Sequence, residues 1–313
     1  MMKPVLIMGC GYVGERVAHR LNHSGRRVTA VVRNPDRAEY LRSQGIEALL
    51  ADLDTGEGLE ALPLAGALVL HSVPPPNEGT EDPRTGTFVE LCRRLPPDNI
   101  VYISTTGVYG DQAGGQVDEL TEPTPQTDRG QRRLDAERRL TALMQETGIS
   151  VVILRAPGIY GPGRLPIDRI LKGEPVICPE EASPGNRIHA DDLATLCVAA
   201  LDHGAAGKVY NVGDGDHRSM TDFVHATADA AGLERPPCVT FAEAEQLIPP
   251  GMMSYLRESR VVLCGRAPVE LGVDLLYPRM EAGIKASLEA EQTAEAAGTA
   301  VHPYRMSRKS LGH

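Results

Sequence analysis

An apolar strand that runs directly into a glycine-rich turn restricts the fold of this chain more than any other feature. The sequence V-L-I-M-G-C-G-Y-V-G spans residues 5–14, and Gly9, Gly11 and Gly14 give the spacing G-x-G-x-x-G. An amphipathic helix is predicted to follow over residues 15–21. In such a unit the first glycine permits a tight turn, the second lets the backbone approach a pyrophosphate, and the third lets the helix pack on the strand. The feature therefore predicts a dinucleotide-binding β-α-β unit whose helix N-terminus faces phosphates.

Short apolar segments then alternate with helical patterns. Strands are predicted over residues 27–33, 47–53, 67–73, 99–105 and 151–155, and helices over residues 34–43, 88–95 and 127–147. Strands that alternate with helices form right-handed β-α-β units. We therefore expect an α/β fold, a Rossmann-type doubly wound parallel sheet with helices on both faces.

The pattern changes where proline and glycine cluster over residues 157–166. Beyond that cluster, helices predicted over residues 190–201 and 220–231 mix with isolated strands over residues 209–212 and 239–241. We predict a dinucleotide-binding core over residues 1–160, a smaller C-terminal substrate-binding region with interleaved core elements over residues 161–288, and a loose C-terminal tail over residues 289–313.

The net charge and the spacing of the cysteines argue against several classes of protein. The 42 acidic residues outnumber the 32 basic ones, and a net charge of −10 argues against general binding to nucleic acid or to anionic membranes. No apolar run approaches the roughly 18 residues of a membrane span, and the N-terminus does not read as a signal peptide. The six cysteines show no C-x-x-C pair and no metal-ligand spacing. We therefore predict no metal site and free thiols in a reducing cytoplasm.

The end of the second predicted strand indicates which dinucleotide binds. An acidic residue there favours NAD, whereas an arginine accommodates the 2′-phosphate of NADP. The chain has Arg33, then Asn34 and Arg37, so we predict NADP, with NAD as the alternative; Arg33 can also be a solvated surface residue. Asp52 is placed either to meet the adenine amino group or to cap a turn. The other cofactor contacts expected from the turn and the strand ends are Tyr12, Val13, Leu53, Ser72 and Val73.

Five further motifs follow in order, Y-I-S-T-T-G-V-Y-G at residues 102–110, V-D-E at 117–119, L-R-A-P-G-I-Y-G-P-G at 154–163, R-I-H-A-D-D-L-A at 187–194 and Y-N-V-G at 210–213. This set resembles the extended short-chain dehydrogenase/reductase superfamily, the nucleoside-diphosphate-sugar epimerase-like proteins, from residue 5 to about residue 288. The resemblance implies an NAD(P)-dependent enzyme for a small polar or sugar-like substrate, with Pro157 and Ile159 beside the nicotinamide. It also implies a possible homodimer through the helices after the fourth and fifth strands, with Leu134, Leu140, Leu143 and Met144 as the seam.

The resemblance breaks at the start of the long helix. Family members combine a Ser or Thr, which corresponds to Thr105, with a Tyr and a Lys in Y-x-x-x-K. Aligned on the A-E pair at residues 136–137, the Tyr position holds Arg129 and the Lys position holds Arg133. Arginine keeps its proton at ordinary pH, so Arg129 cannot alternate between acid and base. We expect Arg133 to bind the nicotinamide ribose and Arg129 to hold an anionic group or an oxyanion, unless both are surface residues.

Another group must then move the proton if the chain is catalytic. His71, at the end of the fourth predicted strand, is the first candidate, because ligands bind at that edge of the sheet. Tyr109 is a second candidate, and Tyr160 and His189 lie in substrate-side motifs; each can instead be a structural residue. Arg187 stands where relatives with a nucleotide-sugar site often carry an aromatic residue, which suggests an anionic substrate of another kind.

These observations predict an NADP-dependent oxidoreductase or epimerase-like enzyme of atypical mechanism, acting on a small polar or sugar-like substrate, and Arg187 favours a substrate with an anionic group. A non-catalytic NADP-binding redox sensor or regulator is the alternative, because intact glycines with a lost tyrosine fit both. A redox-neutral isomerase that holds NAD tightly is a third possibility.

Overall fold

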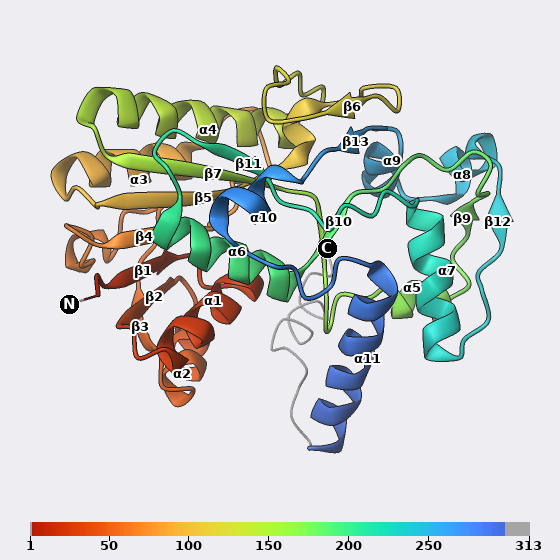
Figure 1. Ribbon diagram of the computed structural model, residues 1–313, viewed down its shortest axis with the longest axis horizontal. Helices are drawn as coiled ribbons and strands as arrows, with labels where there is room; N and C mark the ends of the chain where they lie inside the picture. Colours follow the sequence, from red (N-terminus) through yellow and green to blue (C-terminus); the bar gives the residue numbers. More distant parts are fainter. Residues whose placement is uncertain (1, 298–313) are drawn as a thin grey trace.

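The computed structural model describes residues 2–297. A single seven-stranded sheet forms its centre, and every neighbouring pair of strands is parallel (Figure 1). The strands in spatial order are β3 (Glu47–Leu50), β2 (Val28–Val32), β1 (Val5–Met8), β4 (Leu68–His71), β5 (Asn99–Thr105), β7 (Ser150–Ala156) and β11 (Val209–Asn211). The predicted fold class, a doubly wound parallel sheet of Rossmann type, is confirmed.

Alternation along the strands divides the core into two layers. In β1, Val5 and Ile7 face one layer, whereas Leu6 and Met8 face the other. The first layer is covered by α1 (Tyr12–His23), α2 (Pro35–Ser43), α6 (Ala190–His203) and α10 (Arg266–Leu271). The second is covered by α3 (Pro83–Arg94) and α4 (Asp128–Thr147). Strands buried on both faces explain why the sequence shows continuous apolar runs there.

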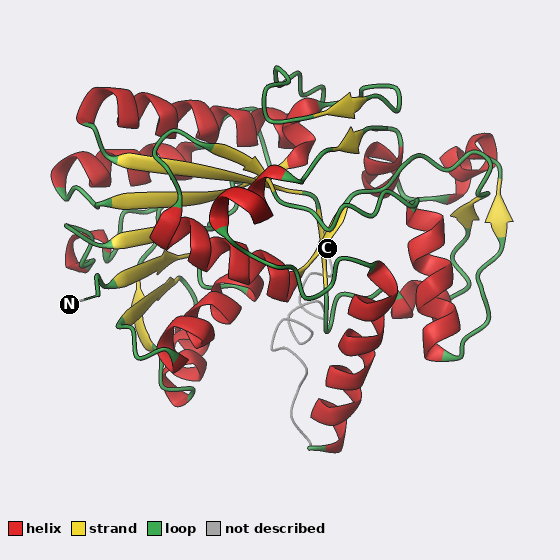
Figure 2. Cartoon of the chain, in the orientation of Figure 1, coloured by secondary structure: helices red, strands yellow, loops and turns green. Residues whose placement is uncertain are grey.

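A smaller C-terminal region lies beyond the carboxyl ends of the strands (Figure 2). It contains three two-stranded parallel ladders, β8 (Gly158–Tyr160) with β10 (Arg187–His189), β9 (Val176–Ile177) with β12 (Cys238–Val239), and β6 (Gln116–Val117) with β13 (Val261–Val262). Its helices are α5 (Ile167–Leu171), α7 (Met220–Ala231), α8 (Phe241–Leu247), α9 (Pro250–Leu256) and α11 (Met280–Ala296). Short 3-10 turns, η1 (Leu59–Ala61) and η2 (Thr106–Tyr109), complete the elements.

Helix caps explain two differences from the sequence expectation. The helix predicted over 88–95 begins earlier, at Pro83, because the Asp82 side chain accepts a hydrogen bond from the Thr85 amide and proline is well suited to the first helical turn. The strand predicted over 239–241 ends at Val239. Thr240 and Glu243 form a reciprocal capping box there, which starts α8 at the next residue.

The first part of the predicted C-terminal tail is helical and belongs to α11. Residues 289–296 continue that helix, and residues 298–313 lie outside the described part of the chain. Within residues 2–297 no helix combines the length and the apolar character that crossing a membrane requires.

The predicted dimer seam is corrected by the packing of α4. Leu140 and Leu143 are fully buried in the second core layer of their own chain, and Leu134 is also buried. Met144 packs against the same layer. The three leucines already have apolar partners within their own chain, so they are not available to form the predicted seam.

Candidate functional site

The glycine turn after β1 has the geometry that a dinucleotide needs. Gly9 has φ +82°, and a Cβ there would lie 2.9 Å from the Val73 backbone nitrogen. A Cβ on Gly14 would lie 3.0 Å from Ile7 Cγ2, so this glycine lets α1 pack closely on the strand. Gly11 precedes α1, and no side chain caps that helix. The first-turn N–H groups of α1 are therefore the donors that a pyrophosphate would engage, and the turn fits the group.

Two of the predicted cofactor residues hold the turn in place. The Ser72 hydroxyl donates to the Gly9 carbonyl at 2.8 Å, across the gap between β4 and β1. The Tyr12 hydroxyl donates to the Pro162 carbonyl at 2.9 Å, and the guanidinium groups of Arg16 and Arg164 each lie 3.9 Å from the centre of its ring. Burial raises the pKa of Tyr12 to about 12. Val13 beside it is buried. Tyr12 thus joins the turn to the loop that follows β8.

The polar residues after β2 differ in whether a ligand can reach their side chains. Asn34 caps α2 by accepting a hydrogen bond from the Arg37 amide at 3.0 Å. The Arg37 guanidinium points inward, where it pairs with Glu15 at 2.6 Å and donates to the Cys10 carbonyl. Arg33 keeps an exposed guanidinium, paired with the Asp54 carboxylate at 3.0 Å. Arg33 is therefore the arginine of this segment that a ligand can reach.

The turn after β3 is closed by its own side chains. Asp52 accepts a hydrogen bond from the Asp54 amide at 2.8 Å, and Leu53 is buried. Asp54 also receives two hydrogen bonds from Arg84, each at 2.7 Å. These bonds and the neighbouring arginines hold the pKa of Asp54 below its ordinary value. Arg33 therefore shares Asp54 with Arg84.

A cavity of about 490 Å³ lies beyond the carboxyl ends of β5 and β7, between the sheet and the C-terminal region. Thr105 ends β5 and lines it, and Pro157 follows β7 and lines it. Ile159, the other residue expected beside the nicotinamide, is partly buried against the first core layer. The position agrees with the rule that ligands of open α/β sheets bind outside the carboxyl ends of the strands.

Positive charge dominates the wall of this cavity. The described lining contains five arginines and a single carboxylate, Glu258. The arginines are Arg129, Arg132, Arg133, Arg169 and Arg260. Glu258 is already paired with Arg129 and Arg260, at 3.0 Å each. The excess of guanidinium groups favours an anionic ligand.

The two arginines at the family's Tyr and Lys positions both reach this wall. Arg133 donates to the Tyr102 hydroxyl at 3.1 Å and to the Ile103 carbonyl at 3.0 Å. Arg129 turns toward α9, where it donates to the Ser254 hydroxyl at 2.5 Å and stacks on the Tyr255 ring. Both arginines line the cavity as well as making these contacts.

The histidines predicted as proton carriers are interior side chains instead. His71 is fully buried, stacks on Phe88 and contacts the Thr85 hydroxyl at 3.0 Å. Burial lowers the pKa of His71 to about 3. His189 is buried against Ser287 and caps α6, and burial lowers its pKa to about 4. Neither histidine lines the cavity. Both are therefore neutral near pH 7 and do not face a ligand there.

The tyrosines predicted with them are also buried. The Tyr109 hydroxyl donates to Asn211 at 2.8 Å and accepts from Arg155 at 3.0 Å, while Arg155 pairs with Glu137 at 2.7 Å. Tyr160 packs edge-on against His189, and burial raises its pKa. Neither tyrosine lines the cavity. These contacts give both residues structural roles.

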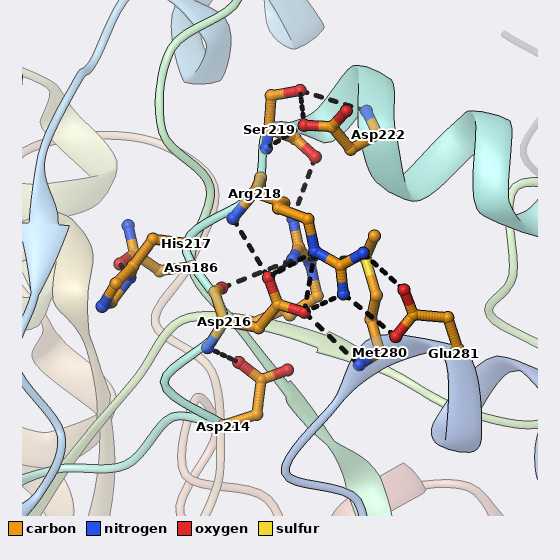
Figure 3. Close-up of polar contacts among 10 residues, drawn as sticks. Asn186, Asp214, Asp216, His217, Arg218, Ser219, Asp222, Met280 and Glu281 are labelled. Carbon is orange, nitrogen blue, oxygen red and sulfur yellow. Dashed lines mark hydrogen bonds and ion pairs between the residues drawn. The ribbon is translucent and has the colours of Figure 1, made fainter.

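Arg187 belongs to a separate polar cluster. Its guanidinium donates to the Ser219 carbonyl at 3.0 Å and lies 3.7 Å from the Asp216 carboxylate. Asp216 pairs in turn with Arg218 at 2.5 Å, and Arg218 pairs with Glu281 of α11 (Figure 3). Arg187 is buried and does not line the cavity. The expectation that it meets a substrate anion is corrected, because its charge is satisfied inside the protein.

Several cavity residues were missed by reasoning from the sequence. Arg132, Arg169, Arg260, Tyr255 and Glu258 carry no motif. Arg132 had one available signal, since it precedes the Lys position of the family motif. The residues on α5 and α9 and before β13 had none, because only the tertiary fold brings those segments to the sheet edge.

Comparison with known proteins gives a consistent result. The family model "NAD dependent epimerase/dehydratase family" matches residues 5–213. Protein YeeZ of Escherichia coli K12 is 32% identical over 246 residues, covering 75% of this chain and 86% of YeeZ. A solved structure of a functionally unknown conserved protein from Silicibacter pomeroyi is 31% identical, has a TM-score of 0.77, and is matched over 93% of this chain and 100% of that one.

A more distant solved structure shares the fold. UDP-glucuronic acid 4-epimerase from Bacillus cereus, determined in complex with NAD, is 19% identical with a TM-score of 0.74. The match covers 95% of this chain and 99% of that one. At 19% identity, this similarity shows a shared fold and no more.

Proposed function

The chain belongs to the NAD dependent epimerase/dehydratase family, and we propose that it is an NAD(P)-dependent enzyme of that family acting on an anionic, sugar-like substrate. The observation that carries the proposal is the arginine-rich wall of the cavity at the carboxyl edge of the sheet. The lining has five arginines and one carboxylate; Glu258 pairs with Arg129 and Arg260, Arg169 pairs with Glu174 outside the lining, and Arg132 and Arg133 have no carboxylate partner among the described ion pairs. Such a wall holds a phosphate or carboxylate group and disfavours a neutral or cationic ligand.

The cofactor would be held by the turn and by the strand ends around it. Gly9 permits the tight turn and Gly14 the close packing of α1, while Gly11 would leave room for the pyrophosphate and the amides that begin α1 would bind it. Arg33 would meet the 2′-phosphate of NADP, for which it must leave Asp54. Arg133 would donate to the nicotinamide ribose. The bound dinucleotide supplies hydride transfer.

The proposed substrate class rests on the arginine-rich cavity wall and on the fold shared with an epimerase of known substrate. The Bacillus cereus neighbour is named as an epimerase of UDP-glucuronic acid, which carries both phosphates and a carboxylate. We propose a nucleotide sugar, with Arg132 and Arg260 on its charged groups. The sequence argument against nucleotide sugars rested on Arg187, which the structure places outside the cavity.

A proton carrier for this reaction is offered by Tyr255. Among the described residues that line the cavity there is no histidine, lysine or cysteine, and Tyr255 is the one tyrosine. Its ring is fixed against Arg129, and its side chain is largely exposed. We propose that the Tyr255 phenol, on α9, takes the part that a tyrosine on α4 has in the resembling family, with Thr105 as a second hydroxyl that lines the same cavity.

Cofactor and substrate binding can be tested separately. NADPH and NADH would each be titrated into the protein while the emission of the reduced nicotinamide is followed; the chain has no tryptophan to compete. NADPH binding at least about tenfold tighter than NADH, about 1.4 kcal/mol, supports the role of Arg33. UDP-glucose and UDP-glucuronic acid would then be offered to the NADP-loaded protein and the products analysed. If the protein bound neither NADPH nor NADH, the proposal would be overturned.

A redox sensor without turnover is the second candidate. It is favoured by Arg129, which stands at the tyrosine position and is held by Ser254 and Glu258. Such a protein would bind NADPH tightly and leave every nucleotide sugar unchanged. Product formation from a UDP-sugar would exclude it.

A further inference from the structure

Two cysteines that are distant in sequence meet on paired strands of the C-terminal region. Cys238 begins β12 and lies opposite Val176 of β9, while Cys178 directly follows β9. The Cys178 amide donates to the Val239 carbonyl at 2.8 Å, which extends the ladder by one bond. Residues two apart on a strand point to the same side, so Cys178 and Cys238 are diagonal neighbours on one face of the ladder, and Cys238 raises the pKa of the Cys178 thiol. The fold therefore holds these thiols next to one another.

Accessibility separates this pair from the other four cysteines. Cys238 is exposed and Cys178 is partly exposed, whereas Cys10, Cys92, Cys197 and Cys264 are buried. Burial raises the pKa of Cys92 and of Cys264 to about 12 and closes these thiols off from a disulfide in solution. The same is true of Cys10, whose pKa burial also raises to about 12. The pKa of Cys178 is raised to about 11 chiefly by the neighbouring Cys238 thiol, a cause that is removed once Cys238 is part of a mixed disulfide. Among the six cysteines, only Cys178 and Cys238 are both accessible to solvent and neighbours across a strand ladder.

We propose that Cys178 and Cys238 form a redox-active dithiol that closes to a disulfide by exchange with a small-molecule disulfide. The exposed Cys238 thiolate attacks one sulfur of the small disulfide, which breaks its S–S bond and releases one thiolate. Cys178 then loses its proton and attacks the Cys238 sulfur of the mixed disulfide, which releases the second thiolate. Two protein thiols are oxidised and one small disulfide is reduced to two thiols.

The surrounding contacts keep the two strands in register for this reaction. The Phe241 amide donates to the Glu181 carboxylate at 2.6 Å, so a second bond ties the segment after Cys238 to the segment after Cys178. Val176 and Ile177 line the cavity, and the Ile177 carbonyl accepts from the Thr221 hydroxyl at 2.6 Å. The disulfide would thus form directly behind a wall of the cavity. The proposal does not depend on which substrate or cofactor the cavity binds.

The test uses the full chain in buffers of graded reduced and oxidised glutathione, trapped by alkylation and analysed by peptide mass spectrometry. Wild-type protein is expected to lose two alkylatable thiols together and to yield a peptide pair linked through Cys178 and Cys238. In Cys178→Ser the second step is blocked, so glutathione should remain on Cys238 at about ten times the wild-type level. The buried-site variant Cys92→Ala should behave as wild type.

Two results would overturn the proposal. One is that both thiols remain alkylatable in oxidised glutathione. The other is that Cys238 of the wild-type protein carries as much glutathione as Cys238 of Cys178→Ser, since the resolving step would then be absent. Measuring free thiols requires no turnover, so either result leaves the proposed enzymatic function open.

Discussion

The guanidinium carbon of Arg129 lies 3.6 Å from the centre of the Tyr255 ring. This contact joins the start of α4, where the resembling family has its tyrosine, to helix α9 of the C-terminal region. The same guanidinium pairs with Glu258 at 3.0 Å, and Glu258 also accepts from the Thr127 hydroxyl at 3.3 Å. The Arg129 guanidinium keeps its proton at ordinary pH, and it holds the ring of Tyr255, whose phenol can exchange a proton, at the wall of the cavity.

The proposed role of Tyr255 predicts a loss of turnover without a loss of binding. Tyr255→Phe keeps an aromatic ring under Arg129 and removes the hydroxyl. Turnover of the UDP-sugar that the wild-type enzyme accepts should fall by about 10²- to 10⁴-fold, the usual contribution of a general acid or base. NADPH affinity should stay the same. Tyr210→Phe is the matched control, because Tyr210 bonds Glu270 away from the cavity. Equal turnover in the two variants would remove Tyr255 from the mechanism.

Arg132 is expected to hold a charged group of the substrate. The side chain is buried at the cavity wall, donates to the Gly79 carbonyl at 2.5 Å, and has no partner for its Nε among the described residues. Arg132→Met should weaken UDP binding by about tenfold or more, since a charge-assisted hydrogen bond contributes about 1.5–3 kcal/mol. Calorimetric titration with UDP measures this. The exposed Arg235, paired with Asp229, supplies the control Arg235→Met; equal affinities would contradict the assignment.

Arg33 is expected to set the preference for NADP. The Arg33 guanidinium is paired with Asp54, so the Asp54 carboxylate would compete with the 2′-phosphate for it. Substitutions of the two residues should therefore change NADPH affinity in opposite directions. Arg33→Ala removes the ligand of the 2′-phosphate and should weaken NADPH binding by about tenfold, or 1.4 kcal/mol. Asp54→Asn removes the competing carboxylate and should strengthen it. NADH affinity should barely change in either variant. A parallel loss for both dinucleotides in Arg33→Ala would show a general effect on the site.

The sequence predicted the sheet and the glycine turn because both depend on local patterns. Apolar runs marked all seven strands of the central sheet, and Asn34 with its following proline marked the start of α2 within one residue. Thr105, Arg129, Arg133 and Pro157 were expected at the ligand site, and all four line the cavity. The resemblance to the family placed these four residues, because its motifs lie at fixed distances from the strand ends.

Side-chain direction and distant segments could not be read in the same way. His71 ends its strand at the expected edge, yet it lies opposite Met8 and Tyr102 and faces the core under α3 with them. A shift of one residue would have turned it to the other face. Tyr255 and Glu258 lie on a short segment with no periodic pattern. Their position depends on tertiary contacts, such as the bond from Asn186 to the Arg260 carbonyl at 2.9 Å.

Asp214 is expected to make the stability of the protein depend on pH. One carboxylate oxygen accepts from the Asp216 amide at 2.9 Å, and the other is buried without a partner among the described residues. Burial raises the pKa of Asp214 from 3.8 to about 7, against the smaller opposing effect of the Asp216 amide. The folded state therefore keeps a proton that the unfolded chain releases between about pH 4 and pH 7.

This difference fixes the sign of the effect. Stability from the protonated Asp214 is fully present below about pH 4 and is lost as the pH rises toward 7, by up to roughly 4 kcal/mol. Asp214→Asn mimics the protonated form at every pH, so it should unfold at higher urea concentration than wild type at pH 8 and match it only near pH 4. Urea denaturation at both pH values measures the effect, with the exposed Asp36→Asn as control. An Asp214→Asn protein no more stable than wild type at pH 8 would mean that the unpartnered oxygen is already solvated in the folded state.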